Sequence, residues 1–197
     1  MTDLRPEEAL GHVAAELSKR RKRFALVGGL AVSVRGEVRT TRDVDLAVAV
    51  ADDMELESLV ADLATAGYRP VATVEQEARK RLAVVRLESP MTFRVDLLAA
   101  SCGIEPEIVA AATAVAFDPI GPVPVAIAED LLAMKLLAAR EGRARDWDDA
   151  LGLLRVNVTL DLELVRRRLT LISDRGFARN EDLSSKLDLL LARRDAD

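Results

Sequence analysis

The chain has 197 residues, half of them hydrophobic and 31% charged, a balance that suits a soluble globular protein and argues against extended disorder. Its formal net charge of -5 does not mark it as a nucleic-acid-binding protein. One cysteine and one histidine exclude an internal disulfide and a zinc-finger framework.

Local features refine this picture. Basic runs at 19–23 and 166–168 are typical of solvated helix ends, but together they leave room for a polyanionic partner. No segment has the charged start, apolar middle and small-residue cleavage site of a secretory signal, and no apolar run is long enough to span a membrane. We therefore expect a cytoplasmic protein with no membrane partner.

The first two thirds of the sequence mix helical and strand patterns. In chain order, the periodicity predicts a helix over 7–22, a buried strand over 24–27, a helix from 30, a strand over 43–50 and a helix over 53–66. Further strands are predicted over 81–87 and 92–99, a short helix over 105–112, and two short strands around a turn at 120–122.

From Glu129 onward the pattern is helical, with helices predicted over 129–141, 146–155, 161–172 and 181–193. The composition shift near residue 128 predicts an α+β fold in two modules: residues 1–127 form a mixed, twisted sheet flanked by helices, and residues 128–197 form a C-terminal helical bundle packed against it. An active cleft between the two modules is then expected.

Three carboxylates carry the predicted chemistry. Asp43 and Asp45 stand two residues apart on a strand, so both project from the same face, with Cα atoms roughly 6.5–7 Å apart. Asp96 alternates with Val95 and Leu97 on another predicted strand. If the two strands pair, the three acids converge and can hold divalent metal, for which Mg²⁺ is the first candidate and Mn²⁺ the alternative. Asp96 could also accept the proton of an attacking hydroxyl.

Two further elements suit a phosphate ligand. Gly28-Gly29 lies between a strand and a helix start, where backbone N–H groups can approach phosphate closely. Lys135, on the first C-terminal helix, can neutralise the charge of a triphosphate or of departing pyrophosphate. Each motif alone is common, and Lys135 alone would be read as a surface lysine. Their ordered combination is much more specific.

The stretch from Val27-Gly28-Gly29 through Gly36 and Arg39 to Arg42-Asp43-Val44-Asp45 resembles the signature of DNA polymerase β-like nucleotidyltransferases, and most of all the AbiEii/MenT-type toxins. The segments 129–136 and 145–149, which contain Lys135, Asp146 and Asp149, are similar to the later motifs of that branch.

By this resemblance, Gly28 and Gly29 bind the triphosphate, Asp43 and Asp45 hold magnesium, Asp96 is the third acid, and Lys135 and Asp146 complete the active site. The resemblance also implies an NTP substrate, transfer of a nucleoside monophosphate (CMP is one candidate) to the 3′ end of tRNA, a block of aminoacylation and a cognate antitoxin. Many members have Gly-Ser where this chain has Gly28-Gly29, so a serine hydroxyl that would contact phosphate is absent.

Some alternatives stay open. Arg39 and Arg42 either contact phosphate or RNA, or merely offset the charge of the acidic pair. The sequence also leaves open whether Asp146 or Asp149 is the acid that enters the site. A small-molecule nucleotidyltransferase of the aminoglycoside-modifying kind shares the N-terminal core, and the chain could instead be a catalytically silent nucleotide-binding regulator. The intact set of three acids argues against the silent regulator.

Overall fold

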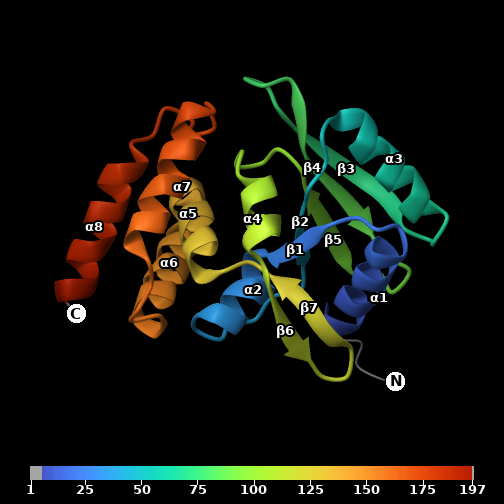
Figure 1. Cartoon of the computed structure of the whole chain (residues 1–197), viewed down its shortest axis with the longest axis horizontal. Coiled ribbons are helices and arrows are strands. Elements are labelled where there is room, and N and C mark those ends of the chain that lie inside the picture. Colours follow the sequence, from blue (N-terminus) through green and yellow to red (C-terminus); the bar gives the residue numbers. More distant parts are fainter. Residues whose placement is uncertain (1–5, 197) are drawn as a thin grey trace.

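The computed structural model describes residues 6–196, in which seven strands form one mixed sheet (Figure 1). The strand order is β3-β4-β5-β2-β1-β7-β6. The strands are β1 (Phe24–Val27), β2 (Val44–Val48), β3 (Arg69–Gln76), β4 (Arg81–Glu88), β5 (Arg94–Leu98), β6 (Thr113–Phe117) and β7 (Gly121–Val125). β2 lies at the centre, antiparallel to β1 and parallel to β5.

Helices cover both sides of this sheet. They are α1 (Pro6–Lys19), α2 (Gly28–Arg35), α3 (Asp53–Ala64), α4 (Glu105–Ala111), α5 (Ala128–Ala138), α6 (Ala144–Val156), α7 (Leu162–Asp174) and α8 (Leu183–Ala196). α1 and α3 lie on one side of the sheet, whereas α2, α4 and the C-terminal helices lie on the other (Figure 1). α3 is capped by Asp52, whose side chain accepts a hydrogen bond from the Glu55 backbone N–H.

The central strands bury one face completely. Val44 and Leu46 of β2 and Val95 and Leu97 of β5 are fully inaccessible to solvent. They pack in one continuous core with leucines of α1 and α3. Such burial stabilises the fold by about 1.5–3 kcal/mol for each large aliphatic side chain. The opposite face of the same strands, by alternation, carries the acidic residues.

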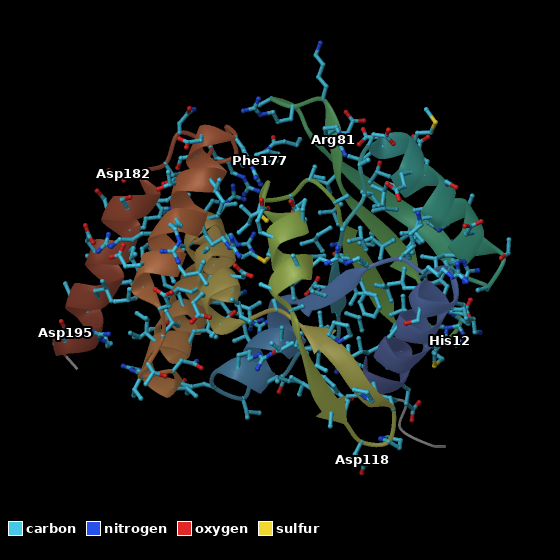
Figure 2. All side chains as sticks on the ribbon, viewed as in Figure 1. His12, Arg81, Asp118, Phe177, Asp182 and Asp195 are labelled. Atoms are coloured by element: carbon cyan, nitrogen blue, oxygen red, sulfur yellow. The ribbon has the colours of Figure 1, made fainter. Side chains whose placement is uncertain are left out.

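Several polar contacts tie the C-terminal helices to the sheet module. Arg175 of α7 donates to both carboxylate oxygens of Glu107 on α4. The side chain of Asn157, at the end of α6, donates to the backbone carbonyl of Arg35 at the end of α2. Phe177, after α7, lies beside the β3–β4 hairpin (Figure 2), with the guanidinium of Arg79 5.9 Å from its ring centroid. These contacts fix the orientation of the helices relative to the sheet.

The predicted α+β architecture is confirmed, and most element boundaries agree within two or three residues. The sequence reasoning missed β3, an edge strand of the sheet whose residues are almost all exposed. An exposed edge strand has no buried face, so it lacks the apolar alternation by which strands are recognised. The predicted 43–50 strand is also shorter, and Asp43 directly precedes β2.

Candidate active site

The paired strands β2 and β5 bring the predicted acids together. In the parallel register Asp45 lies directly opposite Asp96, so both side chains project from the same face of the sheet. Asp43 is close enough for its negative charge to act on Asp45. The three positions therefore form one acidic edge, as the alternation of the two strands predicts.

Two arginines contact this acidic edge. Arg86 of β4 donates from Nε and Nη2 to the two oxygens of Asp96, at 2.9 and 2.7 Å. Arg94 Nη1 lies 3.2 Å from Oδ2 of Asp43. Because Arg86 engages both Asp96 oxygens, Asp96 is turned toward β4. Within residues 6–196 no three acidic, histidine or cysteine side chains form a ready metal site. The role of Asp96 as a third metal ligand stays a prediction.

Asp45 is the acid of this edge whose negative charge is least offset by neighbouring positive groups. Burial, followed by the negative charges of Asp96 and Asp43, raises the pKa of its carboxyl from 3.8 to about 6. The hydrogen bond from the Gly29 backbone N–H and the positive charge of Lys135 act in the opposite direction but are smaller. A cation at this position would therefore relieve repulsion that the protein alone leaves in place.

Gly28 and Gly29 bring the start of α2 against the acids. Gly28 has φ +64°, and a Cβ built on it would lie 1.9 Å from Oδ2 of Asp45. A Cβ on Gly29 would lie 2.2 Å from Nη2 of Arg39. A side chain at position 28 would meet Asp45 and would also be strained by the positive φ, so Gly28 is required there. At position 29 a side chain would have to displace the mobile end of Arg39.

A second charged cluster comes from the C-terminal helices. Lys135 Nζ of α5 lies 2.9 Å from Oδ1 of Asp146 and 2.7 Å from Oδ2 of Asp149, both on α6. Arg143 Nε donates to the other oxygen of Asp146 at 2.6 Å. Asp146 and Asp149 are buried, at 4% and 7% exposure. Both acids therefore belong to the cluster, and the role of each in the reaction stays a prediction.

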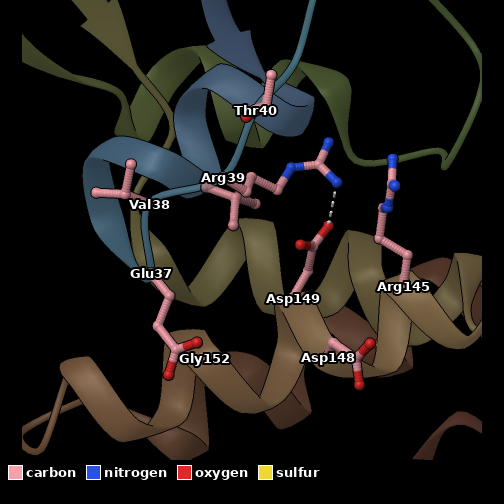
Figure 3. A pocket seen from close by; sticks show the side chains of 9 residues that line it. Glu37, Val38, Arg39, Thr40, Arg145, Asp148, Asp149 and Gly152 are labelled. Carbon is pink, nitrogen blue, oxygen red and sulfur yellow. Dashed lines mark ion pairs between the residues drawn. The ribbon is translucent and has the colours of Figure 1, made fainter.

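Arg39 joins this cluster to the glycine turn. Its Nη1 lies 3.2 Å from Oδ2 of Asp149 (Figure 3), in a pocket between the 37–40 loop and α6 that Arg145 also lines. Ser33 positions the loop, because its hydroxyl donates to the carbonyl of Arg39 and accepts from the N–H of Arg39. The Arg39 side chain thus spans from the N-terminal sheet module to the C-terminal helices.

One cavity of about 570 Å³ joins these groups. It is lined by Gly28, Gly29, Arg39, Asp45, Lys135, Gly142, Arg143, Ala144, Arg145 and Asp146. A glycine-lined backbone, a high-pKa carboxyl and four cationic side chains share this space. Such an arrangement suits a polyphosphate that carries a divalent cation.

Of the sequence-predicted residues, Asp43, Asp96, Arg42 and Asp149 lie outside the lining of this cavity. Arg42 and Asp43 line a neighbouring pocket, so the structure separates Arg39 from Arg42. Sequence reasoning missed Arg86, Arg94 and Arg143. Arg86 alternates with the buried Val85 and Leu87 on β4, but this pattern becomes informative only once β4 is known to pair with β5.

A family model described as the AbiEii toxin nucleotidyl transferase of a type IV toxin–antitoxin system matches residues 11–196. The chain belongs to this AbiEii family. It is accordingly a nucleotidyltransferase, and the family implies an NTP substrate, a divalent metal and an antitoxin partner. No curated protein sequence matches this AbiEii-family chain.

Solved structures agree with this assignment at the level of the fold. The antibiotic-resistance factor ANT(2″)-Ia in complex with adenylyl-2″-tobramycin has a TM-score of 0.56 and 17% identity over 85% of this chain and 97% of its own. MenT4, a nucleotidyltransferase toxin from Mycobacterium tuberculosis H37Rv, has a TM-score of 0.52 and 19% identity over 83% of this chain and 62% of its own. Within residues 6–196, no helix combines the length and apolarity needed to cross a bilayer.

Proposed function

We propose that this AbiEii-family protein transfers a nucleoside monophosphate from an NTP to the 3′ end of tRNA, releases pyrophosphate and thereby blocks aminoacylation. The observation that carries the proposal is the meeting of Asp45, Gly28 and Lys135 in one cavity. The chemistry of nucleotidyl transfer needs a carboxylate for metal, a close backbone for phosphate and a cation for the leaving group, and these three residues supply them.

Asp43 and Asp45 fit the metal that the reaction requires. Their carboxylates are hard oxygen donors on the same side of the chain, and the pKa of Asp45 is raised first by burial and then by the negative charges of Asp96 and Asp43, which a divalent cation would offset. We propose Mg²⁺, with Mn²⁺ as the alternative. When bound, the ion would polarise the reacting phosphate and offset charge on the departing pyrophosphate.

The triphosphate itself is held, in this proposal, by the cavity that extends from Asp45 toward α6. The N–H groups at the start of α2 face phosphate favourably because a helix N-terminus carries a partial positive charge. Arg39, Lys135 and Arg143 then exchange part of their pairing with Asp146 and Asp149 for phosphate oxygens.

In the chemical step the acceptor hydroxyl oxygen attacks the α-phosphorus. A new phosphorus–oxygen bond forms, the bond between the α-phosphorus and the bridging oxygen breaks, and pyrophosphate leaves with that oxygen. We propose that Asp96 accepts the hydroxyl proton, since it lies opposite Asp45 in the strand register. Arg86, which contacts both Asp96 oxygens, would hold the carboxylate in one orientation.

We propose that the cleft lies at the boundary between two modules, residues 1–127 and 128–197. The cavity supports this division, because Gly28 and Asp45 come from the first module and Lys135 and Asp146 from the second. Closure of one module on the other would change the shape of the cavity without a change in either module.

A small-molecule acceptor is the second candidate function. It is favoured by the structural similarity to ANT(2″)-Ia, which covers nearly all of that chain. Charge argues for RNA instead, because Arg42, Arg86 and Arg94 flank the acids and would repel a cationic aminoglycoside.

In the deciding experiment, the protein is incubated with each labelled NTP, Mg²⁺ and total tRNA. The label transferred to tRNA is compared between wild type and Asp45→Ala. Label on tRNA that is lost in the variant supports the proposal. Label that appears only on added aminoglycosides would replace it with the second candidate. Exposed Asp62 on α3 gives the matched control, and Asp62→Ala should transfer label like wild type.

A further inference from the structure

The acidic edge borders a second pocket, which Asp43 lines and Asp45 does not. This pocket has a volume of about 650 Å³ and lies between the 40–43 segment and the β4–β5 turn. Its lining includes Thr40, Arg42, Asp43, Thr92, Phe93 and Arg94. Asp45 lines the glycine cavity and Asp43 lines this second pocket, so the acid pair stands between the two.

The chemistry of the second pocket differs from that of an NTP site. Among the described residues its lining has two arginines and one partly buried aromatic ring but no glycine, and Pro6, the first residue of α1, also lines it. Arg42 and Arg94 are exposed, and Arg94 keeps only a pairing with Asp43 at 3.2 Å, in which both side chains are nearly half exposed. Exposed pairs of this kind are weak, so the guanidinium is free to exchange Asp43 for a phosphate.

The wall of this pocket is a rigid, strained turn. Thr92 has φ +64°, a left-handed conformation that β-branched residues rarely adopt. The turn is closed by hydrogen bonds from Thr92 N–H to the Ser89 carbonyl at 2.8 Å and from Phe93 N–H to the Ser89 hydroxyl at 3.0 Å. These bonds fix Phe93 and Arg94 beside the acids, and strain held next to reactive groups is typical of functional segments.

We infer that this second pocket binds the terminal nucleotides of a single-stranded RNA acceptor, a statement that rests on the proposed transfer to an RNA 3′ end. Arg42 and Arg94 contact backbone phosphates, and Phe93 offers an apolar ring for a base. The terminal hydroxyl then lies on the Asp43 side of the acid pair, facing an NTP that enters from the glycine side. The acceptor and donor therefore reach the acids from opposite pockets.

The test is equilibrium binding of a fluorescent single-stranded RNA with a free 3′ hydroxyl, measured over a salt series without NTP. We compare wild type with Arg42→Gln/Arg94→Gln. The matched control is Arg166→Gln/Arg167→Gln on α7, which removes the same charge from a basic run that lines neither pocket. Thermal unfolding of each variant confirms that it is folded.

The pocket variant should bind the RNA about tenfold more weakly, and the slope of log K against log salt should become shallower by about 1.4, the value for two lost phosphate contacts on a single strand. The control should keep the wild-type slope. Arg94→Lys, which keeps a cation, should recover part of the affinity.

A wild-type slope in the pocket variant, or an equal loss in the control, would overturn this inference. The affinity for MgNTP is measured in parallel and should not fall, because these arginines lie outside the glycine cavity and removing their charge makes the potential at the acids more negative. If RNA binding depends on Arg42 and Arg94 but wild type transfers no label to tRNA, the second pocket is an RNA-binding site and the proposed reaction is wrong.

Discussion

The two halves of the site differ in how their charges are compensated. On the C-terminal helices, Lys135 lies within 3 Å of both Asp146 and Asp149, so each of these two buried acids has a cationic partner. On the strands, Asp45 has the like charges of Asp43 and Asp96 for neighbours, and the pKa of its carboxyl is raised to about 6. In the helical half both of these acids are paired with Lys135, whereas in the strand half Arg86 and Arg94 pair with Asp96 and Asp43 and the pKa of Asp45 stays raised.

The ion cluster on the helices and the buried Asp45 on the strands contribute to function in different ways. Removing one partner from a buried ion cluster is destabilising because the other charge is left unpaired, and the cluster presents its cations only when a stronger anion displaces the carboxylates. An uncompensated acid costs stability in the free protein and regains it when metal binds. Mutations in the two halves should therefore change stability in opposite directions, which the following experiments test.

The largest effect is expected for Lys135→Met. The substitution leaves the buried acids Asp146 and Asp149 without their shared cation, and we expect the free energy of unfolding to fall by about 3 kcal/mol. Chemical denaturation measures the change. Lys19→Met is the control, since Lys19 is 69% exposed and its partner Glu16 keeps a second cation, Arg20, so the substitution should cost less than about 1 kcal/mol. Equal losses in both variants would remove the distinction between the two halves.

Gly28→Ala should have the next largest effect. The new Cβ would meet Oδ2 of Asp45 at 1.9 Å in addition to the strain of φ +64°. Gly121→Ala is the matched control, because Gly121 has φ +89° and open space around the position of a Cβ. We expect about 1 kcal/mol of destabilisation from the conformation alone in the control, and about 2 kcal/mol more with loss of transfer activity in Gly28→Ala.

Arg86→Gln tests whether Asp96 can join the metal site. Removal of the guanidinium frees both Asp96 oxygens and makes the potential at Asp45 more negative. Mg²⁺ should therefore bind about fivefold more tightly, equivalent to about 1 kcal/mol. The measurement is a calorimetric Mg²⁺ titration. Arg81→Gln on the same strand, where Arg81 pairs with Asp53 away from the acids, should leave the affinity unchanged. Weaker Mg²⁺ binding in Arg86→Gln would exclude Asp96 from the metal site.

The parts of this site that could be predicted from sequence depend on local rules. Alternation along a strand places Asp43 and Asp45 on one side, and a double glycine between a strand and a helix marks a close approach of the backbone. Lys135 on a helix after the sheet module was likewise recognisable from the resemblance to a known family. Each of these inferences needs only a few neighbouring residues.

The parts that were missed depend on pairing between distant segments. Arg86 reaches Asp96 only because β4 and β5 are antiparallel in one particular register, which periodicity does not specify. The two pockets flanking the acid pair depend on the paths of the 37–43 segment and the β4–β5 turn, for which a single sequence gives no spacing rule. Edge strand β3 was missed because it has no buried face.

The last predicted effect is a pH dependence of stability in the metal-free protein. The pKa of Asp45 is about 6 in the folded chain and has its ordinary value of 3.8 when unfolded. Between these values the folded state binds more protons than the unfolded state, so the free energy of unfolding should fall as pH rises from about 4 to about 6 and stay low above that range.

Asp45→Asn should remove this decline, so the variant should be more stable than wild type at neutral pH by about 1–2 kcal/mol, less than the full two-unit shift because solvent screens the charges. Urea denaturation across this pH range in metal-free buffer provides the measurement.

The lowered pKa of Glu16, at about 2 because of Lys19 and Arg20, affects stability in a more acidic range and is common to both proteins. Added Mg²⁺ should stabilise wild type but not the variant. Parallel pH curves for the two proteins would show that Asp45 is already compensated, and the contrast between the two halves of the site would then be wrong.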